Sequence, residues 1–101
     1  MIKHVVMWTF KDHAEGATKQ ENIVKFTTML TSLVGVVPGI ELLEVGAKQA
    51  ASPADNYDVV LITEFKTWVD LQAYAVHPEH QKVVTFAKQV VSGRAAVDYE
   101  F

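Results

Sequence analysis

The hydrophobic pattern marks four polar residues as buried: His4, Tyr74, His80 and Asp98. A buried polar group without a partner costs roughly 1–3 kcal/mol, so each of them needs a structural or a functional reason. Histidine exchanges protons near neutral pH, a tyrosine hydroxyl donates hydrogen bonds, and a carboxylate orients an imidazole. Gathered in one apolar pocket, these groups have the chemistry to remove a proton from a carbon atom next to a carbonyl group.

Each of these residues, taken singly, has a simpler explanation. A lone histidine on an apolar face is more often a hydrogen-bonded core residue than a catalyst, and this applies to both His4 and His80. Tyr74 alone is typical of a core residue with its hydroxyl at the rim, and Asp98 alone would offset a histidine charge. The chemical interpretation therefore rests on all four residues converging in space.

The first strand and the first helix place two parts of this set. Ile2–Lys11 alternates as a strand, with His4 on one of its faces. The other residues of that face are Ile2, Val6, Trp8 and Phe10. Thr18 and Glu21 have the spacing of a capping box, which predicts a helix over Lys19–Val34. The apolar stripe of this helix consists of Ile23, Phe26, Leu30, Leu33 and Val34.

Two strands, two helices and a last strand follow. Ile40–Ala47 and Tyr57–Phe65 are apolar segments joined by a Ser- and Pro-containing loop, which favours a long hairpin. Helices are predicted over Trp68–Val76 and Pro78–Ser92, the second ended by a glycine, and Ala95–Phe101 alternates as a strand. The helix residues expected to face the sheet are Leu71, Tyr74, Ala75, His80, Val83, Val84, Ala87, Val90 and Val91.

The spacing of His77 and His80 is also that of a metal-binding pair. Proline is favoured at the first position of a helix, so Pro78 predicts that His77 is the N-cap of the helix that carries His80. A cap residue faces away from the apolar stripe of its helix. We therefore do not expect a metal at this pair.

The order of elements predicts an α+β fold, the ferredoxin-like β-α-β-β-α-β arrangement, as one domain over residues 1–101. Helices cover only one face of the antiparallel four-stranded sheet. The other face carries Val5, Met7, Val60 and Ile62, a larger apolar patch than a soluble monomer tolerates. We therefore expect a C2 homodimer that packs sheet against sheet. In that arrangement Asp98 faces the helices.

The composition excludes several classes of function. The chain has 101 residues, 50% apolar, with no cysteine and a net charge of −3. Without cysteine there is no disulfide, thiolate-bound zinc, iron–sulfur cluster or cysteine nucleophile. The basic residues are scattered, which argues against a nucleic-acid partner. No apolar run reaches the length of a membrane span or of a signal-peptide core, so we expect a soluble, cytoplasmic protein that does not bind membranes.

Four segments resemble the stress-responsive dimeric A/B barrel (Dabb) domain family. They are IKHVVMWTFKD from Ile2, VPGI from Val37, YAVHPEHQKV from Tyr74 and DYE from Asp98, and together they extend over essentially the whole chain. The Y-x-x-H-P-x-H spacing is the most specific of them. The resemblance implies a ferredoxin-like protomer whose sheet packs against that of a second copy to form a dimeric α/β barrel.

The family contains plant stress proteins, bacterial members of unassigned function, and polyketide cyclases of the olivetolic acid cyclase type, which close a linear polyketide without a cofactor. In these cyclases the catalytic pair corresponds to Tyr74 and His80, and the strand-one histidine and the C-terminal aspartate are also present here. Leu30 stands where the cyclase has tyrosine, and Trp68 where it has valine. The resemblance therefore implies a pocket of another shape, and the cyclase's substrate is not carried over.

The resemblance also bears on ligands. The pocket between sheet and helices is expected to be lined by Val6, Trp8, Phe26, Leu30, Leu61, Trp68, Leu71, Val83 and Val84. Some family members hold a divalent cation such as Mg²⁺ by backbone carbonyls that correspond to Val34, Val37 and Ile40, for which an ordinary helix end is an equal alternative. No other cofactor is expected.

The expected reaction is a cofactor-free cyclisation or isomerisation of a small apolar carbonyl compound. His80, neutral in an apolar pocket, would take the proton next to the carbonyl, and Tyr74 would donate to the enolate oxygen. Asp98 or His4 would fix the tautomer of His80. Two alternatives stay open: a non-catalytic stress-response or assembly protein whose pocket is simply core, and a cofactor-free monooxygenase of the related antibiotic-biosynthesis type.

Overall fold

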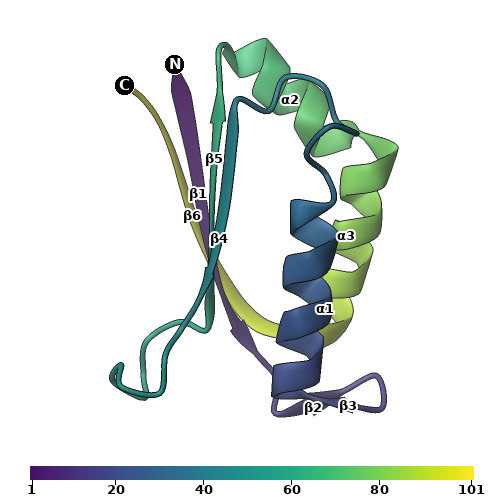
Figure 1. Ribbon diagram of the computed structural model, residues 1–101, viewed down its shortest axis with the longest axis vertical. Helices are drawn as coiled ribbons and strands as arrows, with labels where there is room; N and C mark the ends of the chain where they lie inside the picture. The colour runs from purple at the N-terminus through teal and green to yellow at the C-terminus, as the bar shows by residue number, and fades with distance from the viewer.

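A four-stranded antiparallel sheet with three helices against one face makes up the computed structural model, which describes residues 1–101 (Figure 1). In chain order the elements are β1 (Ile2–Phe10), β2 (His13–Ala14), β3 (Ala17–Thr18), α1 (Lys19–Thr31), β4 (Leu42–Ala47), β5 (Val59–Phe65), α2 (Trp68–Val76), α3 (Pro78–Val90) and β6 (Val91–Glu100). The strand order is β4-β5-β1-β6, and β2 and β3 form a separate short hairpin. The predicted ferredoxin-like α+β fold is confirmed.

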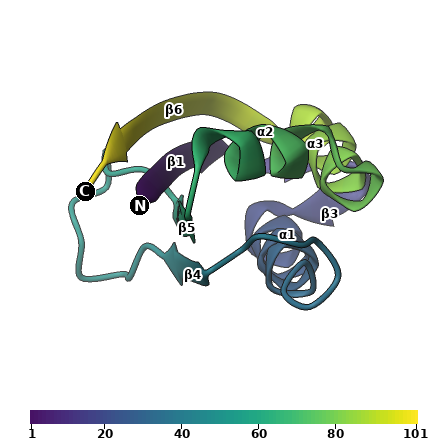
Figure 2. The same cartoon turned by 90° about the horizontal axis from the view of Figure 1, so that it is seen from above.

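The central strand β1 sets the two faces of the sheet. It pairs antiparallel with β5 and with β6, so that His4 lies opposite Thr63 on one side and Asp98 on the other. Residues directly opposite each other in a ladder point to the same face. The helices all lie on one face of the sheet, as the view from above shows (Figure 2), and His4 is on that face because it lines a cavity together with residues of α1 and α3. The predicted placement of Asp98 on the helix-facing side is therefore confirmed.

The helix starts follow the local signals in the sequence. Thr18 and Glu21 form a complete capping box at the start of α1. His77 is the N-cap of α3, where its Nδ1 accepts a hydrogen bond from the Glu79 backbone N–H at 3.1 Å, and Pro78 is the first helical residue. His77 is thus committed to the cap, as predicted.

The helix ends were predicted less well. α1 stops at Thr31 rather than Val34 because its last residues tighten into 3₁₀-type turns, and the Val34 side chain is consequently exposed. Ala75, expected on the inner face of α2, is also exposed, and Phe86, absent from the predicted stripe of α3, is buried. Near 3.6 residues per turn, the edge of an apolar stripe is the part that periodicity defines least.

The junction between α3 and β6 is the largest departure from the prediction. α3 ends at Val90, and β6 begins at Val91 with no intervening loop. The end of β1 pairs with these residues, and this ladder replaces the last helical turn that the sequence pattern predicts. Gly93 is a strand residue here and does not end a helix. A Cβ at Gly93 would lie 2.8 Å from Thr9 Oγ1, so the Thr9 side chain would have to move to admit any other residue.

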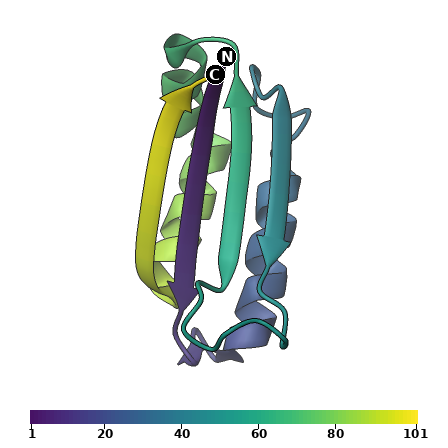
Figure 3. The same ribbon diagram turned by 90° about the vertical axis from the view of Figure 1, so that its left-hand side faces the viewer.

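The face of the sheet opposite the helices has no cover (Figure 3). Its partly or largely exposed apolar side chains are Val5, Met7, Val60, Ile62, Val97 and Tyr99. The two chain termini lie side by side at one end of this sheet, where the Phe101 N–H donates to the Met1 carbonyl. None of the helices has the length and hydropathy that a membrane span requires.

Candidate active site

An apolar cavity of about 320 Å³ lies between the sheet and the helices α1 and α3. Its lining residues are His4, Val6, Trp8, Phe26, Leu30, Leu61, His80, Val83, Val84, Ala87, Lys88, Val91 and Arg94. Both histidines selected from the sequence therefore open into one cavity. Most of the apolar residues expected around it are also on its wall.

Two residues expected on this wall lie elsewhere. Trp68 is exposed, and its indole N–H donates to a Glu100 carboxylate oxygen at 2.9 Å beside the chain termini. Leu71 is buried in the core but does not line the cavity. The physical reason is the position of α2, which crosses the end of the sheet where the termini lie, while the cavity extends along α3 (Figure 1).

The tautomer of His80 is fixed by the chain itself. Its Nδ1 lies 3.0 Å from the Ala75 carbonyl oxygen. Because a carbonyl oxygen can only accept, Nδ1 must carry the proton, and in the neutral ring Nε2 is left as an acceptor with no protein partner. The prediction that Asp98 or His4 fixes this tautomer is wrong, since the last turn of α2 provides the acceptor.

The surroundings of His80 favour its neutral form. Burial is the main cause that lowers the pKa of His80, and the positive charges of His4, Arg94 and His77 act in the same direction. The hydrogen bond to Ala75 opposes them without reversing the result. At neutral pH the side chain is therefore an uncharged base whose free nitrogen lone pair is Nε2.

Tyr74 is fully buried beside His80. Its ring centroid lies 4.3 Å from that of His80 and 5.1 Å from that of Phe65. Its hydroxyl is the single buried side-chain polar atom in the chain without a hydrogen-bond partner. Burial raises the pKa of Tyr74 to about 12, so the hydroxyl keeps its proton at physiological pH. The tyrosine adjoins the cavity without lining it.

His4 and Asp98 form the other half of the predicted set. His4 Nδ1 lies 2.5 Å from an Asp98 carboxylate oxygen, across the ladder between β1 and β6. The His4 ring meets the Tyr74 ring edge-on at a centroid distance of 6.2 Å. The four residues thus converge, but as two linked pairs. Tyr74 and His80 come from the helices, and His4 and Asp98 come from the sheet.

Two cationic residues on the cavity wall were not selected from the sequence. Lys88 comes from α3 and Arg94 from β6. Arg94 lies opposite Trp8 in the ladder and shares the helix-facing side of β6 with Asp98. The period-2 alternation of the last strand would have identified it if the strand had been started at Val91 instead of Ala95.

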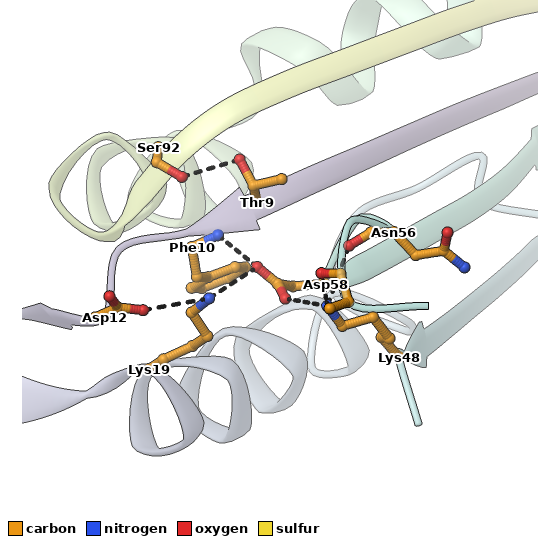
Figure 4. A network of polar contacts seen from close by, with 9 residues as sticks. Thr9, Phe10, Asp12, Lys19, Lys48, Asn56, Asp58 and Ser92 are labelled. Carbon is orange, nitrogen blue, oxygen red and sulfur yellow. Dashed lines mark hydrogen bonds and ion pairs between the residues drawn. The ribbon is translucent and has the colours of Figure 1, made fainter. Parts of the chain in front are cut away.

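Asp98, expected to be buried, is exposed, and the buried carboxylate of the chain is that of Asp58, which was missed from the sequence (Figure 4). Asp58 accepts the Phe10 backbone N–H at 2.8 Å, and its oxygens lie 3.6 Å from Lys19 Nζ and 3.4 Å from Lys48 Nζ. Burial alone would raise the pKa of Asp58, but the Phe10 N–H and the two ammonium groups outweigh it and hold the pKa below its ordinary value. The only signal in the sequence is an aspartate placed directly before an apolar strand.

The chain offers few groups for a metal ion. No three acidic, histidine or cysteine side chains cluster in a way that would hold one. The backbone carbonyls of Val34, Val37 and Ile40 accept no hydrogen bond from the chain, so their oxygens are free to meet water or a hard cation. The residues present are therefore compatible with the oxygen-only site that the resemblance implies.

The sequence of the chain is similar to those of known proteins. Residues 2–101 match the family described as stress responsive A/B barrel domain (Dabb). The chain is 27% identical over 101 residues to the stress-response A/B barrel domain-containing protein DABB1 of Arabidopsis thaliana. The alignment includes 98% of this chain and 46% of that relative, so the chain spans about half of the relative's length.

Solved structures share the fold. A dimeric protein of unknown function with a ferredoxin-like fold from Bacteroides fragilis has a TM-score of 0.87 and 29% identity, over 99% of this chain and 95% of that one. An antibiotic biosynthesis monooxygenase has a TM-score of 0.73 and 13% identity, over 100% of this chain and 98% of that one, a likeness of fold alone. With a match over nearly its whole length, the chain belongs to the stress-responsive A/B barrel (Dabb) family.

Proposed function

We propose that the chain is a cofactor-free acid–base enzyme that removes a proton from carbon next to a carbonyl group in a small, largely apolar molecule. The observation that carries this proposal is the free Nε2 of His80. Its partner nitrogen is held by Ala75, its pKa is lowered, and it opens into an apolar cavity. A neutral base that lines an apolar cavity is suited to deprotonation of carbon.

The proton transfer balances with the groups at hand. His80 Nε2 takes the proton, the electron pair of the C–H bond becomes the new carbon–carbon double bond, and the carbonyl π pair moves to oxygen. Tyr74 adjoins the cavity wall, and we assign it the hydrogen bond to that oxygen once the bound molecule displaces the wall beside it, because its raised pKa keeps it protonated and its hydroxyl lacks a partner. The enolate can then be reprotonated, which is isomerisation, or attack a second carbonyl, which is cyclisation.

The pair of His4 and Asp98 supports this site from the sheet. It places a second ionisable group beside the Tyr74 ring, and the carboxylate fixes the orientation of the His4 ring. We assign His4 and Asp98 the role of positioning residues for Tyr74 and the bound molecule. The free carbonyls of Val34, Val37 and Ile40 are proposed to hold a divalent cation such as Mg²⁺ by oxygen ligands alone, away from the proton transfer.

Deuterium exchange tests the reaction without knowledge of the natural substrate. The probe is the ketone 4-oxo-4-phenylbutanoate in D₂O, with loss of the proton signal next to its carbonyl followed by NMR. We expect the wild type to accelerate exchange, with a rate that rises along an acid limb centred below the ordinary histidine pKa of about 6.5. His80→Gln should abolish the acceleration, and His13→Gln, which removes an exposed histidine that does not line the cavity, should not. Equal exchange rates in the wild type and His80→Gln would exclude the mechanism and favour a non-catalytic stress or assembly role.

We further infer that two copies pack through the uncovered face of the sheet as a C2 homodimer. The loop over residues 48–58 extends from the sheet away from the helices, and with Met7, Gly46 and Val60 it encloses a hollow of about 450 Å³ on that side (Figure 1). Such a hollow and the adjoining apolar face suit a second copy of this chain. Val97→Asp should convert a dimer to a monomer in light scattering, whereas Val69→Asp on the outer side of α2 should not. A monomeric wild type would contradict this assembly.

A further inference from the structure

The cavity wall carries charge of one sign. The ionisable residues that line it are His4, His80, Lys88 and Arg94, and no aspartate or glutamate is among the lining residues. This is unexpected in a chain with 12 acidic and 9 basic residues and a net charge of −3. The Asp98 carboxylate, on the same side of β6 as Arg94, is already engaged by His4.

Lys88 and Arg94 differ from every other basic residue in the chain. Lys3, Lys19, Lys48, Lys66 and Lys82 form ion pairs, Lys11 donates to a backbone carbonyl, and Lys25 lies over the Phe86 ring. Only Lys88 and Arg94 have no such partner, and these two, both exposed to solvent, are the ones on the cavity wall. The unpaired cations and the apolar cavity therefore coincide.

Arg94 is stronger evidence for a bound anion than Lys88 is. A lysine in the last turn of a helix interacts favourably with the helix dipole, which is sufficient reason for Lys88 in α3. Arg94 lies within β6, a strand at the edge of the sheet, so it is not part of a helix whose dipole would account for its charge. Its guanidinium has the planar, two-pronged donor geometry that matches a carboxylate.

We infer that the cavity takes an organic anion: an apolar carbonyl compound that carries a carboxylate, bound by Arg94 with Lys88 at the rim. The apolar body occupies the space among Val6, Trp8 and Phe26. The carboxylate replaces the counter-ion that the chain does not supply. This inference rests on the proposed function for the carbonyl group, while the recognition of the anion rests on the cations alone.

The test compares a matched pair of probes by isothermal titration calorimetry. The acid is 4-oxo-4-phenylbutanoate, and its neutral twin is 4-oxo-4-phenylbutanamide. The wild type should bind the acid about tenfold or more tightly than the amide, as one charge-assisted hydrogen bond in a cavity provides. Added salt should reduce this preference.

Substitutions identify the side chain that causes the preference for the acid over the amide. Arg94→Gln should reduce it to about twofold or less, and Arg94→Lys should restore part of it, because the charge returns without the planar fork. Lys88→Gln should have the smaller effect. Lys82→Gln is the matched control, since Lys82 lies on the exposed side of the same helix in an ion pair with Glu79. A wild type that binds the acid no better than the amide, or an Arg94→Gln protein that keeps the full preference, would overturn the inference.

The exchange experiment separates this inference from the proposed function. If the acid is preferred but neither probe exchanges its protons faster with the protein, anion recognition stands and the acid–base proposal fails. If both probes bind equally and exchange equally fast through His80, the acid–base proposal stands and anion recognition fails.

Discussion

Asp58 and Tyr74 are two buried polar side chains near opposite ends of the same sheet. Asp58 has a backbone N–H and two lysines within reach, whereas the Tyr74 hydroxyl has no partner at all. A satisfied polar group holds structure together, and an unsatisfied one lowers stability by roughly 1–3 kcal/mol. The difference indicates that the end of the sheet at Asp58 stabilises the fold, whereas the end beside Tyr74 is available to a ligand.

The largest expected effect is the loss of the carboxylate at the structural end. Asp58→Ala leaves the Phe10 N–H and the facing ends of Lys19 and Lys48 without their shared acceptor. We expect the free energy of unfolding in urea to fall by about 3 kcal/mol. Asp12→Ala is the control, because Asp12 also contacts Lys19 but is 91% exposed, and it should cost about 0.5 kcal/mol or less. A decrease of less than about 1 kcal/mol in the free energy of unfolding for Asp58→Ala would contradict the stabilising role that distinguishes Asp58 from Tyr74.

A smaller effect is expected from acid. Because the pKa of Asp58 is lower in the folded chain than in the unfolded chain, the unfolded chain binds more protons as the pH falls. Its contribution is complete above the ordinary aspartate pKa of about 3.9 and is lost as the pH falls through the folded value. Urea unfolding of the wild type should therefore weaken more steeply below pH 4 than that of Asp58→Asn. Parallel pH profiles for the two proteins would contradict this.

The smallest change in stability is expected at Tyr74. Tyr74→Phe removes a hydroxyl that has no partner, so the free energy of unfolding should stay the same or rise by up to about 1 kcal/mol. The same variant should lower the rate of deuterium exchange by about tenfold or more, because the enolate oxygen loses its donor. Tyr57→Phe, at an exposed tyrosine outside the cavity, should change neither quantity. A Tyr74→Phe protein that is clearly destabilised but fully active would make this hydroxyl structural.

The sequence patterns that predicted the structure correctly are local ones. Thr18 with Glu21, and His77 with Pro78, define helix starts by hydrogen bonds made within one turn, and both were predicted correctly. Alternation along β1 placed His4 on the helix-covered face, and the same rule placed Asp98. These features depend on neighbours a few residues apart in the chain or on strict period 2.

Long-range contacts explain what the sequence did not show. The start of β6 at Val91 is set by its ladder with β1. The tautomer of His80 is set by the Ala75 carbonyl only five residues away, but that contact depends on the turn between α2 and α3. The partners of Asp58 come from β1, α1 and the end of β4, which no local pattern connects. Arg94 was missed as a consequence of the misplaced strand. Neither a backbone carbonyl acceptor nor the pairing of distant strands is marked by a particular side chain in the sequence.

The central claim concerns one atom, Nε2 of His80, and nitrogen NMR of the imidazole rings addresses it most directly. A titration of ¹⁵N-labelled protein reports both the tautomer and the ionisation midpoint of each histidine, and His80→Gln assigns the signal. We predict the neutral Nδ1–H tautomer for His80 at pH 7, with a midpoint below the ordinary value of about 6.5. An Nε2–H tautomer, or a midpoint at or above that value, would contradict the account.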